Sequence, residues 1–251
     1  MEDISVTFFR EGSPEEMGGP ILIEGLPGIG QVGKLAAEYM IEILGAERIA
    51  EIHSIFFPPQ VMIDENGVTR LVKNEIYRYE KEGKVLLFLV GDFQSTSGEG
   101  HYILSDEYLN VAEELGVRRI YTLGGFGVGH LVEEPRVMGA VNIPELRQEI
   151  EETGVVFGRD EPGGGIVGAA GLLLGLGALR GIEGVCLMGE TSGYLVDPKG
   201  AAKVLAVLSS LTGVTVDPTL LMERAAEMEQ AIAAMVEHQE RQGEDELRYI
   251  G

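Results

Sequence analysis

Short, continuous apolar runs alternate along this chain with longer stretches in which apolar residues recur every three or four positions. A run such as VLLFLV at residues 85–90 is typical of a strand buried on both faces, and the wider spacing is typical of a helix packed on a sheet. Strands are therefore predicted over residues 4–9, 20–25, 48–57, 61–63, 68–77, 85–90, 119–123, 155–157 and 185–188. Helices are predicted over residues 33–44, 105–115, 144–152, 166–179, 198–211 and 218–241.

Several short-range signals mark where these elements begin and end. Ser105 and Asp197 are predicted to cap the N-termini of two helices, and Gly116 is predicted to end the first of them. Asn66-Gly67 lies between two strand-like segments and predicts a β-hairpin. The glycine-rich segment 124–129 is predicted to form a turn after its strand.

The repeated order of strand, helix and strand predicts an α/β protein. We expect a three-layer sandwich with a mostly parallel sheet, helices on both faces, a β-hairpin excursion and a long C-terminal helix. No linker divides the chain, so residues 1–217 are predicted to form a single α/β domain. Residues 218–241 form the helix, packed on that domain or at a subunit interface, and residues 242–251 form an acidic tail that ends in LRYIG.

Composition narrows the classes of function. The net charge of −22 opposes binding to nucleic acids and to anionic membranes. The chain has one cysteine, Cys186, in an apolar run, which excludes a disulfide framework and predicts a buried side chain. No apolar stretch is long enough for a membrane span, and the first residues lack the features of a signal peptide, so a cytoplasmic protein is expected.

A G-x-G-x-x-G pattern at Gly28, Gly30 and Gly33 lies between a predicted strand and a predicted helix, the context of a dinucleotide-binding turn. Pro27 stiffens this turn, and no acidic residue ends the next strand to bind a ribose. We therefore interpret the glycines as structural turns, with an anion or nucleotide sensor at Gly28–Gly33 as an alternative. The same structural interpretation applies to Gly124, Gly125 and Gly127.

Polar side chains follow several predicted strands, where α/β sheets usually hold their sites. Asp92, His101, His130 and Glu190 could together support a small-molecule hydrolase or phosphorylase. Their spacing matches no specific catalytic motif, and the four histidines are too dispersed to predict a metal site. A non-enzymatic protein without a cofactor or a metal is therefore the preferred interpretation.

The C-terminal segment offers two candidate contact surfaces. The last predicted helix has a narrow apolar seam that suits packing on its own domain or a subunit interface, made of Leu221, Ala225, Met228, Ile232 and Met235. The tail ends in apolar residues beside a free carboxylate, a plausible docking peptide for a protein partner, made of Leu247, Tyr249, Ile250 and Gly251.

Four passages, in this order, carry a resemblance to a known family: residues 24–33, residues 89–92 with 100–102, residues 114–125, and residues 187–198. Over roughly residues 15 to 225 the chain resembles the proteasome assembly chaperone family, the archaeal homologues of the second eukaryotic assembly chaperone. The passages consist mainly of glycine turns and strand ends, and their joint order supports the resemblance.

The resemblance implies a sheet flanked by helices, similar to nucleoside phosphorylases and peptidyl-tRNA hydrolase-like folds. It also implies a homo-oligomer without catalytic residues or cofactor, whose partners are proteasome subunits or other proteins. Some members end in a hydrophobic-Tyr-any tripeptide that inserts between proteasome α-subunits. Here Tyr249 is third from the end, which departs from that pattern. The resulting hypothesis is a cytoplasmic, homo-oligomeric, chaperone-like assembly factor that binds archaeal 20S proteasome subunits or the assembled particle.

Overall fold

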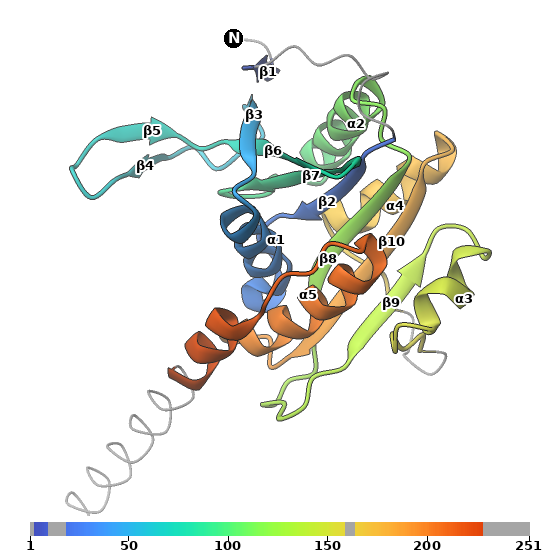
Figure 1. Cartoon of the computed structure of the whole chain (residues 1–251). Helices are drawn as coiled ribbons and strands as arrows, with labels where there is room; N and C mark the ends of the chain where they lie inside the picture. Colours follow the sequence, from blue (N-terminus) through green and yellow to red (C-terminus); the bar gives the residue numbers. More distant parts are fainter. Residues whose placement is uncertain (1–2, 10–18, 159–163, 228–251) are drawn as a thin grey trace, which may run out of the picture.

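The computed structural model of the chain describes residues 3–9, 19–158 and 164–227, and an eight-stranded sheet lies at its centre (Figure 1). The strands of this sheet are β1 (Ile4–Phe8), β2 (Ile21–Gly25), β3 (Glu47–Ser54), β6 (Asn74–Lys81), β7 (Lys84–Gly91), β8 (Arg119–Gly127), β9 (Val137–Val141) and β10 (Glu183–Thr191). Two further strands, β4 (Val61–Ile63) and β5 (Thr69–Leu71), pair with each other.

Strand order across the sheet is β1-β3-β6-β7-β2-β8-β10-β9. The central strands β7, β2, β8 and β10 are parallel neighbours. The flanking strands are antiparallel to their neighbours, β9 on one side and β6, β3 and β1 on the other. The predicted α/β class is confirmed, but the sheet is mixed where a mostly parallel one was expected: it is parallel at its centre and antiparallel at both flanks.

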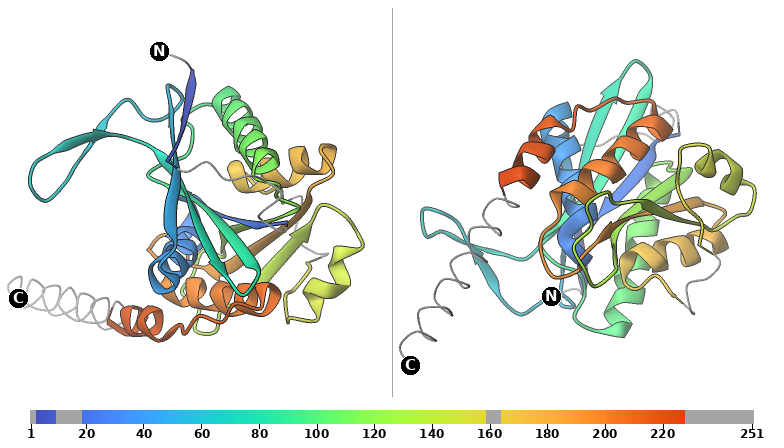
Figure 2. Two further views of the ribbon diagram at one scale, coloured as in Figure 1. Left: turned by 45° about the horizontal axis from the view of Figure 1, so that its top comes forward. Right: turned by 90° about the horizontal axis from the view of Figure 1, so that it is seen from below.

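Helices cover both faces of the sheet and give the predicted three layers (Figure 1, Figure 2). They are α1 (Val32–Leu44), α2 (Gly98–Glu114), α3 (Leu146–Glu151), α4 (Ala169–Leu179) and α5 (Pro198–Thr212), with a short 3-10 helix, η2 (Ile29–Gln31), before α1. Helices α1 and α5 pack side by side on one face, and α2 and α4 pack on the other. Asp197 caps α5 as predicted, because its side chain accepts a hydrogen bond from the Gly200 amide at 2.8 Å.

Alternate side chains of the central strands enter two apolar clusters, one on each face of the sheet. In β7, Phe88 lies under α1 and α5, whereas Leu87 and Leu89 lie under α2 and α4. All three are almost inaccessible to solvent. Burying a side chain of this size stabilises the fold by roughly 1.5–3 kcal/mol, so the continuous apolar run reflects a strand covered on both faces.

Strands β4 and β5 form a two-stranded arm that projects from the body of the sheet (Figure 1, Figure 2). The hairpin predicted at Asn66-Gly67 is confirmed, with Gly67 at φ +78°. The Asp64 side chain accepts hydrogen bonds from the amides of Asn66 and Val68 and so closes the turn. One strand was predicted over residues 68–77, but the chain forms two strands there. Strand β5 ends at Leu71 in the arm, and β6 begins at Asn74 in the large sheet.

Helix α2 begins at Gly98, well before the predicted start at Ser105. Its N-cap is Ser97, whose hydroxyl accepts a hydrogen bond from the Gly100 amide at 3.0 Å, and Ser105 is buried within the helix. The first turn contains two glycines, which disfavour a helix, so the start of the helix was not predicted. Gly100 is required by a tertiary contact, since a Cβ there would lie 2.7 Å from the Cβ of Phe56. Gly116 ends the helix at φ +74°, as predicted.

Strand β8 continues through Gly124, Gly125 and Gly127, where a turn was predicted. All three glycines are extended, and at Gly125 the missing side chain lets a neighbouring backbone approach the strand. A Cβ on Gly125 would lie 2.2 Å from the Ile29 carbonyl oxygen. Gly125 therefore reflects close packing, and sequence alone does not distinguish such a glycine from one in a turn. Strand β9 was not predicted, and residues 155–157 contribute a single bridge, Met138 to Val156.

The start of the last helix is anchored to the domain. Residues 219–227 are helical, and Leu221 and Ala225 are buried against the body. The preceding turn is fixed by Tyr39 of α1, whose hydroxyl donates a hydrogen bond to the Asp217 carbonyl at 2.6 Å. Met228, Ile232, Met235 and the tail residues Leu247, Tyr249, Ile250 and Gly251 lie outside the described residues.

Candidate functional site

A pocket of about 590 Å³ opens at the carboxyl ends of the parallel strands β2, β8 and β10. Its walls are mainly apolar, and they come from the strand ends, from the turn before α1 and from the segment that leads into α4. Three polar side chains line it: Glu24, Gln94 and His101. This is the edge at which α/β sheets usually bind ligands.

Glu24 is the most unusual residue of the pocket. It is 1% exposed, and burial raises the pKa of its carboxyl from 4.5 to about 8. The Leu26 amide donates a hydrogen bond to Oε1 at 2.9 Å, and backbone contact at Leu123 opposes the rise of the pKa more weakly. Its Oε2 is buried and has no hydrogen-bond partner in the described part of the chain. A neutral carboxyl therefore faces the pocket at pH 7.

Sequence analysis did not single out Glu24. A signal was present, because the residue is the one charged position in the apolar strand run ILIEG and stands next to its carboxyl end. A carboxyl at such a position is costly unless it is neutral, paired or bound to a ligand. Strand pattern alone, however, gives neither the burial nor the missing partner.

His101, one of the four candidate residues, and Gln94 also line this pocket. Burial lowers the pKa of His101, so its imidazole is neutral at pH 7. The amide of Gln94 is fully engaged, because its nitrogen donates to the Pro27 carbonyl at 2.8 Å and its oxygen accepts from the Ala169 amide at 2.9 Å. Gln94 thus fixes the start of α4 to the turn before α1.

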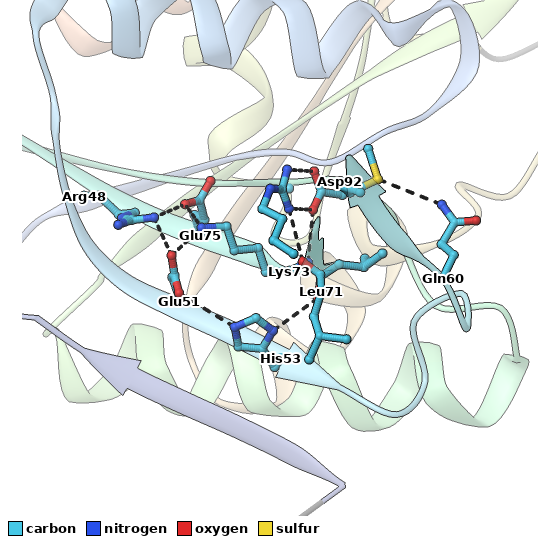
Figure 3. Close-up of polar contacts among 12 residues, drawn as sticks. Arg48, Glu51, His53, Gln60, Leu71, Lys73, Glu75 and Asp92 are labelled. Atoms are coloured by element: carbon cyan, nitrogen blue, oxygen red, sulfur yellow. Dashed lines mark hydrogen bonds and ion pairs between the residues drawn. The ribbon is translucent and has the colours of Figure 1, made fainter. Parts of the chain in front are cut away.

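Asp92 is not among the residues that line the pocket, and its carboxylate lies in an ion-pair network with Arg70 and Lys73 (Figure 3). Arg70 binds both of its carboxylate oxygens, at 2.6 and 2.9 Å, and the Lys73 amide donates a third hydrogen bond at 3.1 Å. Burial acts to raise the pKa of Asp92, but these contacts outweigh it and hold the pKa below its ordinary value. Asp92 therefore anchors β5 to the end of β7.

The same network joins β3 to β6 (Figure 3). Arg48 and Lys73 each pair with both Glu51 and Glu75, and the His53 imidazole lies 3.7 Å from Glu51. Every charged group in this cluster has an opposite partner. The network is therefore a structural clamp between antiparallel strands.

Glu190 and His130 are not among the residues that line the pocket. Glu190, at the end of β10, is bound by the Arg136 guanidinium and by the Arg136 amide, which lower the pKa of its carboxyl. His130 is exposed, and its Nδ1 lies 3.1 Å from the Val128 carbonyl oxygen. Of Asp92, His101, His130 and Glu190, only His101 lines the pocket. The structure does not assemble these four into an acid-base site.

Within the Gly28–Gly33 turn, Gly30 and Gly33 are packed against the protein's own atoms, whereas Gly28 lines the pocket. A Cβ on Gly30, which has φ +61°, would lie 2.7 Å from the Thr191 hydroxyl. A Cβ on Gly33 would lie 2.2 Å from the Leu123 carbonyl oxygen, so this glycine allows α1 to contact β8 directly. In a dinucleotide-binding fold, glycines of this turn let the backbone approach a pyrophosphate. Here Gly30 and Gly33 let the backbone approach strands β10 and β8.

Two exposed apolar surfaces accompany the pocket. The arm carries Val61, Ile63, Val68 and Leu71, each about half exposed or more. At its base lies a hollow of about 510 Å³ lined largely by Ile55, Phe57, Pro58 and Pro59. At the pocket, Ile29 and Val167 are lining residues with exposed apolar side chains. Scattered apolar side chains are normal on a surface, but a projecting arm that carries four is typical of a contact element.

Within residues 3–9, 19–158 and 164–227, no three His, Cys, Asp or Glu side chains come close enough to hold a metal ion. None of the helices in this described portion is long and apolar enough to span a membrane. Cys186 is buried in β10, and burial raises the pKa of its thiol to about 12.

Comparisons with known proteins give one consistent result. The sequence model described as the "PAC2 family" matches residues 22–236. The uncharacterized protein MJ1210 of Methanocaldococcus jannaschii is 41% identical over 246 residues, which cover 94% of each chain.

Two solved structures from Pyrococcus furiosus are also similar. The crystal structure of PbaB, described as an archaeal proteasome activator, has a TM-score of 0.88 and 40% identity over 94% of this chain and 99% of that one. The crystal structure of PbaA, described as an archaeal homolog of proteasome-assembly chaperone, has a TM-score of 0.79 and 26% identity over 98% and 97% of the two chains. The likeness thus covers nearly the whole described fold.

Proposed function

This chain belongs to the PAC2 family, and from that premise we propose that it is a homo-oligomeric, chaperone-like factor that binds archaeal 20S proteasome subunits. The observation that carries the proposal is the likeness to PbaB, an archaeal proteasome activator, at 40% identity over nearly the full length of both chains. The likeness to PbaA, a homolog of proteasome-assembly chaperone, supports the same class of partner.

A non-enzymatic role agrees with both the comparisons and the geometry. The similar structures are described by their relation to the proteasome. Asp92 and Glu190 are held by arginines, so two of the four candidate catalytic groups act as structural anchors. The alternative of an anion or nucleotide sensor at the Gly28–Gly33 turn is disfavoured, because Thr191 and Leu123 occupy the space beside Gly30 and Gly33.

The acidic surface supports a protein partner with a basic contact region. A net charge of −22 creates a negative field that speeds encounter with a positive surface and repels nucleic acid. The contact region that we propose is the C-terminal tail, through Leu247, Tyr249, Ile250 and Gly251. The seam of the last helix leads toward it, and Leu221 and Ala225 at the start of that seam are used for packing on the body.

Native mass spectrometry of the full chain mixed with archaeal proteasome α-subunits tests the proposal. We expect a complex at moderate salt, weakened by about tenfold or more when the chain is truncated after Arg241. Within the tail, Tyr249→Ala should weaken the complex because it removes an aromatic anchor, and the matched substitution Glu244→Ala should not. Absence of a complex for the full chain would contradict the function. A complex that is unaffected by truncation would support the function but show that the contact is made by the folded body.

A further inference from the structure

The floor of the pocket at the strand ends contains a polar row in an otherwise apolar face. Glu24 of β2 is opposite Thr122 of β8, and Thr122 is opposite Cys186 of β10. All three side chains are buried on the face covered by α2 and α4. Adjacent positions on this face, such as Leu22 and Ile120, are aliphatic. A row of buried polar groups at this place is costly for folding unless the groups are hydrogen-bonded.

Glu24 has the geometry of a ligand-binding group that lacks its ligand partner. The residue is 1% exposed and lines the pocket, and only its Oε1 accepts a hydrogen bond of normal geometry. Its Oε2 is buried without a partner within the described residues. An unsatisfied buried carboxyl oxygen costs about 1–3 kcal/mol, which a donor from a bound molecule would recover.

The remaining lining of the pocket supplies no positive charge to pair with Glu24. Among the described residues that line it there is no lysine or arginine. His101 of α2 is neutral, as are the buried Tyr108 of α2 and Cys186 of β10, which are the other titratable groups that face Glu24. The walls include Leu26, Ile29, Ile166, Val167 and Met188, which suit an aliphatic chain.

We propose that this pocket binds a primary alkylammonium group, with the ammonium on the Glu24 carboxylate and its aliphatic stem along the apolar walls. The cation replaces the carboxyl proton, which leaves to solvent, and the ion pair forms where the dielectric constant is low. The negative field of the whole chain favours entry of a cation. Two sources offer this chemistry, a free amine and a lysine side chain of a partner protein. The inference does not depend on proteasome binding.

Isothermal titration calorimetry of the full chain with n-pentylammonium tests the pocket directly, with 1-pentanol as the neutral probe of matched size. We expect pentylammonium to bind at least about tenfold more tightly at pH 8.5 than at pH 6.5, because Glu24 ionises between these values. At pH 6.5, titrations in two buffers of different ionisation enthalpy should show close to one proton released per amine bound. Equal binding of 1-pentanol and pentylammonium would overturn the proposal.

Glu24→Gln keeps the size and the Leu26 hydrogen bond but removes the charge, so it should abolish amine binding and the proton release. Glu190→Gln is the matched control, since it neutralises another buried glutamate that does not line the pocket, and its binding should equal that of the natural chain. Unchanged binding by Glu24→Gln would overturn the proposal. Titration with Nα-acetyl-lysine methylamide identifies the source: binding comparable to pentylammonium supports a lysine side chain, and its exclusion supports a free amine.

Discussion

Glu24 and Glu190 show how the same residue type takes opposite roles in one sheet. Both are at least 95% inaccessible, but Glu24 has no cationic partner in the described structure, whereas Glu190 is bound by Arg136. Burial therefore raises the pKa of Glu24 to about 8, and the Arg136 contacts lower the pKa of Glu190. Sequence alone could not separate these cases, because the arginine lies 54 positions away along the chain.

The two glutamates should give stability profiles of opposite slope. Between pH 4.5 and about 8, the folded chain keeps the Glu24 proton that the unfolded chain loses, so this group makes the free energy of unfolding fall by up to about 1.4 kcal/mol per pH unit. Glu24→Gln removes that slope. Between pH 4 and pH 8, the free energy of unfolding of the variant should therefore rise by about 4 kcal/mol relative to that of the natural chain.

Glu190→Gln provides the opposite comparison. The lowered pKa of Glu190 stabilises the fold above its unfolded pKa, and this contribution disappears as the pH falls through the folded value. The variant should therefore be less stable than the natural chain at pH 7 and approach it at low pH. Urea unfolding at a series of pH values measures both profiles, and parallel profiles for the two variants would contradict the assignment.

At the scale of elements, α2 illustrates why a helix start is hard to place from sequence. Ser105 has the residue type of an N-cap and precedes an apolar pattern, but its hydroxyl is buried without a hydrogen-bond partner in the described structure. Ser97 forms the cap, because its hydroxyl meets the Gly100 amide at 3.0 Å. The glycines that follow Ser97 resemble a loop in sequence, and the close contacts with Ser95 and Phe56 explain Gly100.

A pair of serine substitutions tests this assignment. Ser97→Ala removes the cap and should lower the free energy of unfolding by about 1 kcal/mol. Ser105→Ala removes a buried hydroxyl that has no partner in the described residues, so it should be neutral or slightly stabilising. Chemical denaturation of both variants gives the comparison. A larger loss for Ser105→Ala than for Ser97→Ala would show that the helix begins at the later serine.

At the scale of the whole molecule, the arm of β4 and β5 exposes apolar side chains that no other part of the described chain covers. An isolated two-stranded hairpin is marginally stable in water, and this one exposes Val61, Ile63, Val68 and Leu71. In the homo-oligomer that we propose, we expect a second copy of the chain to cover this surface. The hollow at the base of the arm gives the second copy an apolar place to dock.

Substitution on the arm should change assembly without changing the fold. Ile63 is 68% exposed, so Ile63→Asp should leave the monomer's stability unchanged while it places a charge in the proposed interface. We expect a smaller particle by size-exclusion chromatography with light scattering. Glu65→Ala, at the exposed tip of the same arm, is the control and should keep the natural mass. An unchanged particle mass for Ile63→Asp would contradict the proposal that the arm lies in the interface.

The sequence by itself determined the α/β class, the buried central strands and the positions of most helices. It did so because periodicity and capping act between neighbours in the chain, as for Asp197 at the start of α5. Tertiary structure decided the antiparallel flanks of the sheet, the extended state of Gly125 and the separation of Asp92 from His101. It also decided the neutral state of Glu24, since burial and partner geometry arise only when distant strands meet.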